Sequence, residues 1–422
     1  MSETELDTAA NCGDDREPAL LPVDEALSRI RAAITVVPDR ERVAVRSALG
    51  RVLATDISAP GDVPMHTNSA MDGYAFAAGS LPDADTADLT VVGTSWAGRS
   101  FDGEVGPGEC VRIMTGAVMP AGADTVEMQE RTDRDGDTVR ISLPQKPGNH
   151  VRYAGEDMKS GTAALPAGRR VTPADLGLIA SLGFGEVDVW RRPRVAFFSN
   201  GDELRSVGEP LRLGDIYDSN RYTLYGMLTR LGVEFLDMGV VRDDPDAIRE
   251  AFTSGARCAD MLITSAGASV GEADYIKDTL DELGEVDFWK MALKPGRPLA
   301  FGRVGDTPFF GLPGNPVSVM VTFYQFVRPA LIRMSGETET PRYRFRARVR
   351  GGIRKRPGRT EYQRGRLTQS TDGSLEVGTT GDQGSGILRS MSVSDCFIVL
   401  TAEQGDVADG DWVVVEPFAG LV

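Results

Sequence analysis

Four short segments rich in glycine and proline carry charged side chains that could act on a phosphorylated ligand. They are SNGDE (199–203), TSAGASVGEAD (264–274), KPGRP (294–298) and GLPGNP (311–316). Glycine lets the backbone approach a ligand closely, and the free N–H groups at a helix start bind anions. Lysine and arginine bind phosphate, and carboxylates bind a hard cation such as Mg²⁺. The four segments together favour a phosphate-bearing ligand held with Mg²⁺.

Each segment taken alone is better explained by turn formation than by binding, because glycine and proline are common turn residues. A binding site is favoured because each segment follows a predicted strand, as RVAFFS precedes 199–203. In an open parallel sheet, ligands bind outside the carboxyl ends of the strands. No G-x-x-x-x-G-K-[ST] motif occurs, which disfavours an ordinary P-loop nucleotidase.

Strands and helices alternate from residue 194 onwards, and this alternation predicts the sheet that positions the four segments. The stretch NRYTLYGMLTRLG predicts a helix that ends at Gly232, and DDPDAIREAF predicts a helix capped by Asp244 with Pro245 in its first turn. Alternating elements of this kind predict a doubly wound, mostly parallel sheet with helices on both faces.

The regions before and after this alternating stretch have different sequence patterns. Residues 63–149 contain short apolar runs separated by turn signals, which predict a small β-rich domain, and the strands after about residue 335 predict another. Val23, Leu27, Ile30 and Ile34 recur at helical spacing, and RVAVRSALGRVLA (42–54) repeats this pattern in outline. A further helix is expected at 172–182, and residues 1–17 are expected to form a loose tail.

Asp72 is a candidate acid outside the four segments. It stands in TNSAMDGYA (67–75) beside a glycine, so it is either a turn-former or a carboxylate placed for chemistry. Thr115 in RIMTGAVMP also precedes a glycine at a predicted strand end, which by itself most simply indicates a turn. With only two histidines in the chain, no Ser-His-Asp set is compelling and a histidine-built zinc site is not expected.

Arginine alternates strictly in RYRFRARVR (342–350), which places these side chains on one face of a strand. Between residues 342 and 366 there are eleven lysines and arginines and one acid, Glu361. The run is compatible with nucleic-acid binding, with a solvated strand edge that discourages sheet pairing, or with a cationic wall for a small anion. The last possibility suits Arg364 in the segment QRG best.

The composition excludes several classes of protein. Lys and Arg total 46 against 62 Asp and Glu, and a net charge of −16 disfavours general binding to nucleic acid or anionic membranes. The four cysteines lie far apart, so we expect a reducing compartment and no disulfide framework. The first residues do not resemble a signal peptide and no apolar run approaches the ~20 residues that span a bilayer, so we expect a cytoplasmic protein.

Nine motifs occur in an order that is far more specific than any one of them. They are NSAMDGYA, RIMTGA, GEDM, SNGDEL, SVGEADY, WKMALKPGRP, GLPGNPVS, QRG and QGSG. In these motifs the chain resembles the molybdopterin molybdenumtransferases, the MoeA family to which the gephyrin E domain belongs, from about residue 20 to residue 420.

The resemblance implies α/β and β domains in one chain. An elongated helical and strand domain would comprise residues 18–62 and 150–190, with an inserted β-rich domain at 63–149. The α/β molybdopterin-binding domain would comprise residues 191–333, and a C-terminal β barrel 334–422. The resemblance also implies a homodimer whose cleft combines the α/β domain of one subunit with other domains of its partner.

The reaction implied by the resemblance is a step of molybdenum cofactor biosynthesis. Molybdate and adenylylated molybdopterin would be the substrates, Mg²⁺ would assist, AMP would be released, and a molybdopterin adenylyltransferase would act upstream. Three alternatives stay open: a non-catalytic molybdopterin-binding or scaffold protein, a tungstate-specific relative, and an adenylyl-transferring relative.

The family's functional positions carry over residue by residue. The residues that resemble catalytic positions are Asp72, Thr115, Glu203, Lys290 and Lys294, and those that resemble metal ligands are Glu203, Asp243, Asp274 and Asp157. The residues expected to bind substrate are Gly267, Ser269, Gly271, Arg297, Pro313, Gly314, Pro316, Arg152, Arg364 and Ser385. The chain departs from the usual motifs at Thr67, Asn200, Ala266 and Arg297, which puts fine ligand geometry in doubt rather than the reaction class.

Overall fold

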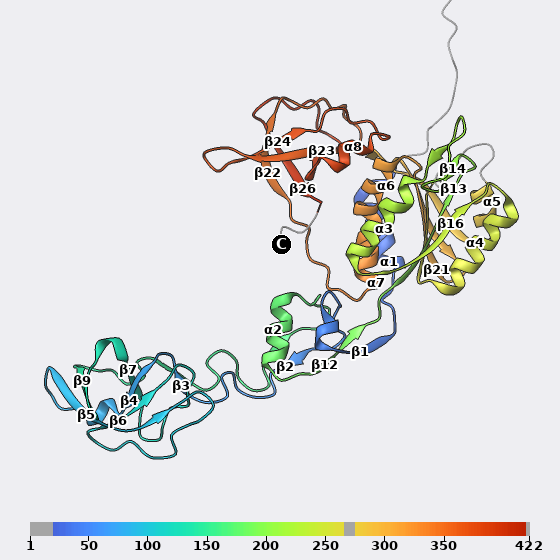
Figure 1. The fold of residues 1–422 in the computed structure, drawn as a ribbon. Coiled ribbons are helices and arrows are strands. Elements are labelled where there is room, and N and C mark those ends of the chain that lie inside the picture. The colour runs from blue at the N-terminus through green and yellow to red at the C-terminus, as the bar shows by residue number, and fades with distance from the viewer. Residues whose placement is uncertain (1–19, 266–274, 419–422) are drawn as a thin grey trace, which may run out of the picture. The chain divides into compact units, whose positions relative to one another are not determined.

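A computed structural model describes residues 20–265 and 275–418, apart from the side chain of Phe288 (Figure 1). The chain divides into two compact units. Unit 1 combines residues 1–41 with 190–422, and unit 2 comprises residues 42–189.

A six-stranded sheet forms the centre of unit 1. Its strands lie in the order β16 (Glu234–Val241), β13 (Arg194–Asn200), β17 (Met261–Ser265), β21 (Thr307–Leu312), β20 (Pro298–Val304) and β18 (Gly284–Lys290). The first four strands are parallel, whereas β20 is antiparallel to both β21 and β18. The prediction of a mostly parallel sheet is therefore confirmed, with one reversed strand near its edge.

Helices cover both faces of this sheet (Figure 1). The helices α1 (Val23–Ala33), α3 (Ser219–Leu231), α6 (Pro316–Thr322) and α7 (Arg328–Met334) pack on one face, and α4 (Pro245–Cys258) and α5 (Tyr275–Leu283) on the other. The division follows from strand alternation, because Val195 and Phe197 join the first core while Ala196 and Phe198 join the second.

The predicted helix boundaries in this sheet are confirmed. The Asp244 side chain accepts a hydrogen bond from the Ala247 N–H at 2.9 Å and so caps α4. Helix α3 ends at Gly232, which has a φ of +72° that favours glycine. Helix α1 carries the predicted apolar spacing, and its Ala26 and Ile30 pack into the core of unit 1.

A closed barrel forms the C-terminal part of unit 1. Its strands are β22 (Phe345–Arg350), β23 (Thr360–Gln369), β24 (Leu375–Thr379), β25 (Cys396–Leu400) and β26 (Trp412–Pro417). The ring runs β23-β24-β22-β26-β25 and closes because β25 also pairs with β23. The short strand β19 (Leu293–Lys294), which follows β18, adds onto β23 and so ties the α/β part to the barrel.

Unit 2 contains a second six-stranded sheet. Its order is β7 (Thr125–Met128), β4 (Gly73–Phe76), β6 (Glu109–Ile113), β5 (Thr86–Ser95), β9 (Thr138–Ser142) and β8 (Asp133–Asp135). A smaller region of the same unit contains α2 (Pro173–Ser181) and the strand pairs β2 (Ile57–Ser58) with β11 (Ala163–Leu165) and β3 (Asn68–Ser69) with β10 (Val151–Arg152). The predicted combination of α/β and β folds is confirmed, including the helix near 172–182.

One predicted helix is wrong. The stretch 42–54 forms β1 (Arg40–Ala44) and the short 3₁₀ helix η1 (Val45–Ala48). Val45, Leu49 and Val52 recur at helical spacing, whereas Val43 and Val45, two positions apart and both β-branched, fit a strand. Gly50, with a φ of +71°, then turns the chain.

Candidate functional site

The register of the unit 1 sheet brings the predicted loops to one edge, here called the rim. Asn200 lies opposite Val241, and Ser265 lies opposite Leu312 in parallel pairing, so β13, β16, β17 and β21 all end there. Because β20 runs the other way, it begins at the same edge, where its Pro298 pairs with Lys290 at the end of β18. Three of the four predicted segments therefore start or end on the rim, and 266–274 in the fourth lie outside the described residues.

Glu203 and Asp243 lie on neighbouring rim loops, and both resemble metal ligands of the family. The N–H of Asp202 donates to Asp243 Oδ2 at 3.3 Å, and the N–H of Asp243 donates to Asp202 Oδ1 at 3.4 Å, so the two loops are tied together. Gly201 has a φ of +149°, and a methyl group there would lie 2.6 Å from Glu203 Oε2. Glycine therefore allows the Glu203 carboxylate to fold back against its own loop.

The donor set of these loops fits Mg²⁺ shared with a phosphorylated ligand. Asp202, Glu203 and Asp243 are exposed, and none forms an ion pair with another described residue. In residues 20–265 and 275–418, no three His, Cys, Asp or Glu side chains converge enough to bind a metal unaided. Mg²⁺ commonly takes one or two carboxylates and completes its shell with phosphate oxygens and water, so two carboxylates suffice.

Three cationic side chains line the next part of the rim. Lys290 ends β18, and Arg297 immediately precedes Pro298, the residue of β20 that pairs with Lys290. Lys294 lies between them, and its Nζ is 3.1 Å from Glu361 Oε1 on barrel strand β23. The Lys294 side chain is 50% exposed whereas that of Glu361 is 5% exposed. The ammonium group therefore reaches solvent while a buried carboxylate orients it.

The loop GLPGNP turns from β21 into α6 at the same rim. Pro313 is buried and Gly314 is exposed, while Pro316 begins the helix. Asn220, at the start of α3, donates a hydrogen bond from Nδ2 to the Gly314 carbonyl at 2.7 Å. This bond fixes the loop beside the start of α6, where the positive end of the helix dipole favours an anion.

Arg364 and Ser385 connect the barrel to this loop. Arg364 is 1% exposed, and its guanidinium donates to Ser390 Oγ at 2.9 Å and to the Gly384 carbonyl at 3.0 Å. Burial lowers the pKa of Arg364 to about 10, and the charge of Asp382 opposes this shift. The next residue in the loop, Ser385, accepts a hydrogen bond at its carbonyl from the Val317 N–H at 3.1 Å. Arg364 therefore acts on the rim through the loop that it holds.

Asp72 and Thr115 lie together in unit 2. Asp72 Oδ1 accepts hydrogen bonds of 2.7 Å from both the N–H and the hydroxyl of Thr115. The backbone bond and then the hydroxyl bond lower the pKa of Asp72, and the charge of Arg112 adds a smaller effect. Gly73 is required beside Asp72, because a methyl group there would lie 2.0 Å from the Glu127 carbonyl oxygen. The arrangement holds one ionised carboxylate at a strand start.

Arg152 and Asp157 also lie in unit 2. Arg152 is exposed on β10, where it pairs in register with Asn68 of β3. Asp157 is exposed in the following loop, and its N–H donates to the Val63 carbonyl at 3.0 Å. Thr67, one of the departures from the family motifs, accepts a hydrogen bond at Oγ1 from the Ala154 N–H at 3.2 Å. Its hydroxyl therefore joins the segments that carry Asp72 and Asp157.

Known proteins are similar to this chain over most of its length. Residues 21–183 match the MoeA N-terminal region (domain I and II), residues 196–333 a probable molybdopterin binding domain, and residues 346–418 the MoeA C-terminal region (domain IV). The molybdopterin molybdenumtransferase of Haemophilus influenzae is 42% identical over 405 residues, which cover 96% of this chain and 100% of that protein. This chain belongs to the MoeA family.

Other MoeA-family proteins are similar over nearly the same length. The molybdopterin molybdenumtransferase of Synechococcus elongatus is 34% identical over 410 residues, covering 94% of this chain and 99% of that protein. A crystal structure of the molybdopterin biosynthesis MoeA protein from Pyrococcus horikoshii superposes with a TM-score of 0.83 at 29% identity, covering 95% of this chain and 100% of that one. In the described part of this MoeA-family chain, no helix has the length and apolar character to cross a membrane.

The structure places the predicted site residues in two groups. The unit 1 group is Glu203, Asp243, Lys290, Lys294, Arg297, Pro313, Gly314, Pro316, Arg364 and Ser385, and the unit 2 group is Asp72, Thr115, Arg152 and Asp157. Gly267, Ser269, Gly271 and Asp274, together with the departure Ala266, lie outside the described residues. The functional roles of both groups stay predictions.

Sequence analysis missed two polar residues at the start of α3. Asp218 is 2% exposed and caps the helix through Oδ1, yet its Oδ2 is buried with no hydrogen-bond partner. Asn220 Oδ1 is also buried without a partner, although Nδ2 of the same amide binds Gly314. The only signal in the sequence was a helix cap at DSN, which by itself indicates a local structural role.

Proposed function

We propose that this protein inserts molybdenum into molybdopterin in a Mg²⁺-dependent step of molybdenum cofactor biosynthesis, with adenylylated molybdopterin and molybdate as substrates and AMP as a product. The relationship to molybdenumtransferases over 96% of the chain supports the reaction class. The observation that carries the finer proposal is the rim of unit 1, where cations, carboxylates and a helix start meet at one sheet edge. These are the groups that a phosphorylated, metal-assisted substrate needs.

The rim residues would bind and orient the anionic parts of the substrates. Lys290, Lys294 and Arg297 would offset phosphate and oxyanion charge, and the positive end of the α6 helix dipole would add to this effect. Glu203 and Asp243 would hold Mg²⁺, which offsets charge on the phosphate oxygens when it is bound. Buried Arg364 would keep the loop of Ser385 against this helix start.

Asp72 would act as a fixed negative group on the water molecule that cleaves the phosphoanhydride. Hydrolysis adds water across the bond between the two phosphate groups, so AMP leaves and the molybdopterin phosphate remains. A carboxylate with a lowered pKa is ionised at neutral pH and orients such a water by accepting its hydrogen bond. The two hydrogen bonds from Thr115 would keep the Asp72 carboxylate ionised and fix its orientation.

A homodimer would complete the site. Asp72 and Thr115 belong to unit 2 and the cationic rim to unit 1, and the family resemblance implies a cleft shared by two subunits. We further propose that the protein acts in the cytoplasm and receives its substrate from a molybdopterin adenylyltransferase. Arg152 and Asp157 would contribute from the same unit as Asp72.

A direct assay tests the proposal. The purified protein is incubated with adenylylated molybdopterin, Mg²⁺ and either molybdate or tungstate, while AMP release and the metal content of the pterin product are followed. We expect AMP and molybdenum-loaded pterin to form together and to stop when EDTA is added. Tight pterin binding without AMP release would instead indicate a non-catalytic scaffold, and faster turnover with tungstate would reassign the oxyanion.

A further inference from the structure

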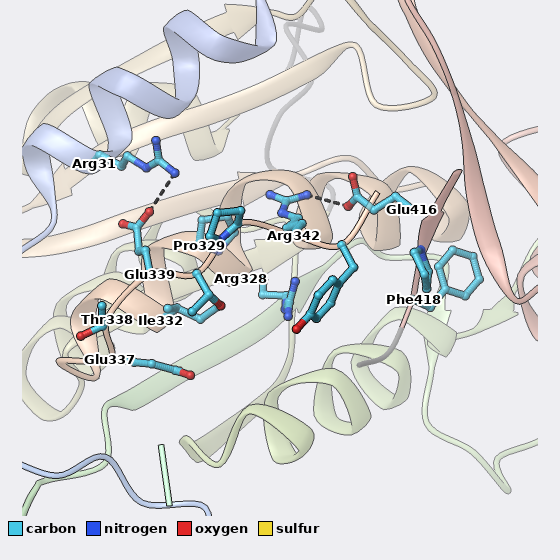
Figure 2. A pocket seen from close by; sticks show the side chains of 14 residues that line it. Arg31, Arg328, Pro329, Ile332, Glu337, Thr338, Glu339, Arg342, Glu416 and Phe418 are labelled. Carbon is cyan, nitrogen blue, oxygen red and sulfur yellow. Dashed lines mark hydrogen bonds and ion pairs between the residues drawn. The ribbon is translucent and has the colours of Figure 1, made fainter. Parts of the chain in front are cut away.

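A pocket of about 490 Å³ lies in unit 1, separate from the rim loops described above (Figure 2). It opens between α7, the connecting segment 337–343 and the end of β26. Its volume falls in the range of roughly 300–1,000 Å³ typical of small-molecule sites. No residue proposed for the transferase reaction lines it.

Two ion pairs border this pocket. Arg31 lies 2.8 Å from Glu339, and Arg342 lies 2.8 Å from Glu416 (Figure 2). Glu416 is 4% exposed and also receives two hydrogen bonds from Arg344, at 3.0 and 2.9 Å. One carboxylate therefore pairs with two arginines, so the net charge at this end of the pocket is positive.

Arg328 is a third arginine of the pocket and takes part in neither of these ion pairs. It is half-buried in the pocket wall, and no hydrogen bond or ion pair joins its guanidinium to any of the residues that the structure describes. Burial and then repulsion from Arg342 lower the pKa of Arg328, while the charges of Glu416 and Glu337 partly oppose this. The guanidinium is partly desolvated and has no carboxylate of its own among the described residues, so a bound anion would form a charge-assisted pair with it.

The remaining walls favour an anion with an apolar body. Pro329, Pro341 and Pro417 line the pocket together with the rings of Tyr343 and Phe418. Tyr343 is 73% exposed, which leaves its ring available to cover a ligand. We propose that this pocket binds a small organic anion, with its carboxylate or phosphate group on Arg328 and its ring or chain against Tyr343 and the prolines.

The arrangement of charges in the pocket favours a ligand with a single anionic group. Glu337 and Glu339 lie toward one side of the pocket and Arg342 toward the other, with Arg328 between them (Figure 2). A single carboxylate or phosphate group therefore matches the Arg328 and Arg342 side, whereas a ligand with several separated charges would meet the two glutamates. Arg has a planar fork of donors that suits either oxyanion.

Calorimetric titration of the full-length protein tests this site. The probes are phenyl phosphate, benzoate and inorganic phosphate, with benzyl alcohol as the neutral counterpart. We expect phenyl phosphate or benzoate to bind at millimolar concentration or below, inorganic phosphate to bind more weakly and benzyl alcohol not to bind. Comparison of the first two probes shows whether phosphate or carboxylate is preferred.

Substitution of Arg328 separates this site from the rim. Arg328→Gln should weaken binding of the preferred probe at least tenfold and raise or preserve Tm in buffer without organic anions. Arg354→Gln, an exposed barrel arginine outside the pocket, should change neither value. Unchanged probe affinity in Arg328→Gln would overturn the proposal, as would a fall in Tm without any anion-dependent stabilisation of the original protein. These measurements do not require transferase activity, so they stand or fall separately from it.

Discussion

The rim of unit 1 and the Asp72–Thr115 pair of unit 2 hold their charged side chains in position in different ways. On the rim, separate loops from several strands supply the charged groups, and contacts between loops hold them, as between Asp202 and Asp243. In unit 2, one carboxylate takes both of its described hydrogen bonds from a single residue, Thr115. We therefore expect loss of one rim group to have a smaller effect on activity than loss of the Asp72 carboxylate.

Asp72→Asn should have the largest effect, because it removes the negative charge while preserving size and the bond to Thr115. We expect AMP release to fall about 100-fold, equivalent to about 2.7 kcal/mol. Asp88→Asn is a matched control, since Asp88 is another exposed carboxylate of unit 2 with a lowered pKa, paired with Arg140. Activity of Asp72→Asn within threefold of the control would remove Asp72 from the site.

Lys294→Ala should have a smaller effect, because Lys290 and Arg297 remain on the rim. A fall in kcat/KM of roughly tenfold is expected, or about 1.4 kcal/mol, with most of it in KM. Arg257→Ala serves as the control, because it removes an exposed cation of unit 1 from the last turn of α4, at the far end of a helix that begins beside the rim. A loss as large as that of Asp72→Asn would show that the rim is as intolerant as the unit 2 pair.

Thr115→Val should change the pH dependence more than the maximum rate. The hydroxyl bond lowers the pKa of Asp72, so its removal raises that pKa, although the backbone bond remains. Activity that requires ionised Asp72 should therefore be lost at a higher pH on acidification than in the original protein. A pH–rate profile measures the acid limb, and Thr115→Ser should restore its position. An unmoved limb in Thr115→Val would show that Asp72 does not control it.

Asn220→Ala should have the smallest effect. It removes the bond to the Gly314 carbonyl and loosens one rim loop, so we expect a roughly threefold rise in KM with kcat unchanged. Steady-state kinetics with adenylylated molybdopterin measure this change. Asn220→Asp preserves an acceptor but not the donor, and it should behave like Asn220→Ala; full recovery would contradict the role of the amide.

Local patterns were sufficient to predict the α/β part of the fold. Asp244 with Pro245 and the terminal glycine of α3 are strong helix signals, and buried runs such as RVAFFS predict strands without long-range information. The same patterns failed at 42–54, where Val45, Leu49 and Val52 have helical spacing but Val43 and Val45 have strand spacing. The reversal of β20 was also unpredictable, because strand direction depends on which neighbour pairs across the sheet.

The candidate site was predictable only in part. Loop chemistry indicated the rim, and the ordered motifs indicated Asp72 and Thr115, but no pattern revealed that Lys294 binds Glu361, since 67 positions separate them. Arg364 was predicted to contact substrate, yet its described contacts are Ser390 and Gly384. Which distant residues meet depends on tertiary packing, and local periodicity carries no information about it.

Closure of the C-terminal barrel affects how readily the protein can aggregate by adding strands to its sheets. Strand β23 pairs with both β24 and β25, so the ring of strands leaves no backbone edge open to a foreign strand. The sheet of unit 2 does have ends, at β7 and β8. Asp133 and Asp135 place charge on the three-residue strand β8, which discourages pairing there. At the other end, β7 carries Glu127, and its Val126 N–H already donates to the Asn149 carbonyl at 3.0 Å. Strand addition should therefore be disfavoured at both ends of this sheet as well as at the barrel.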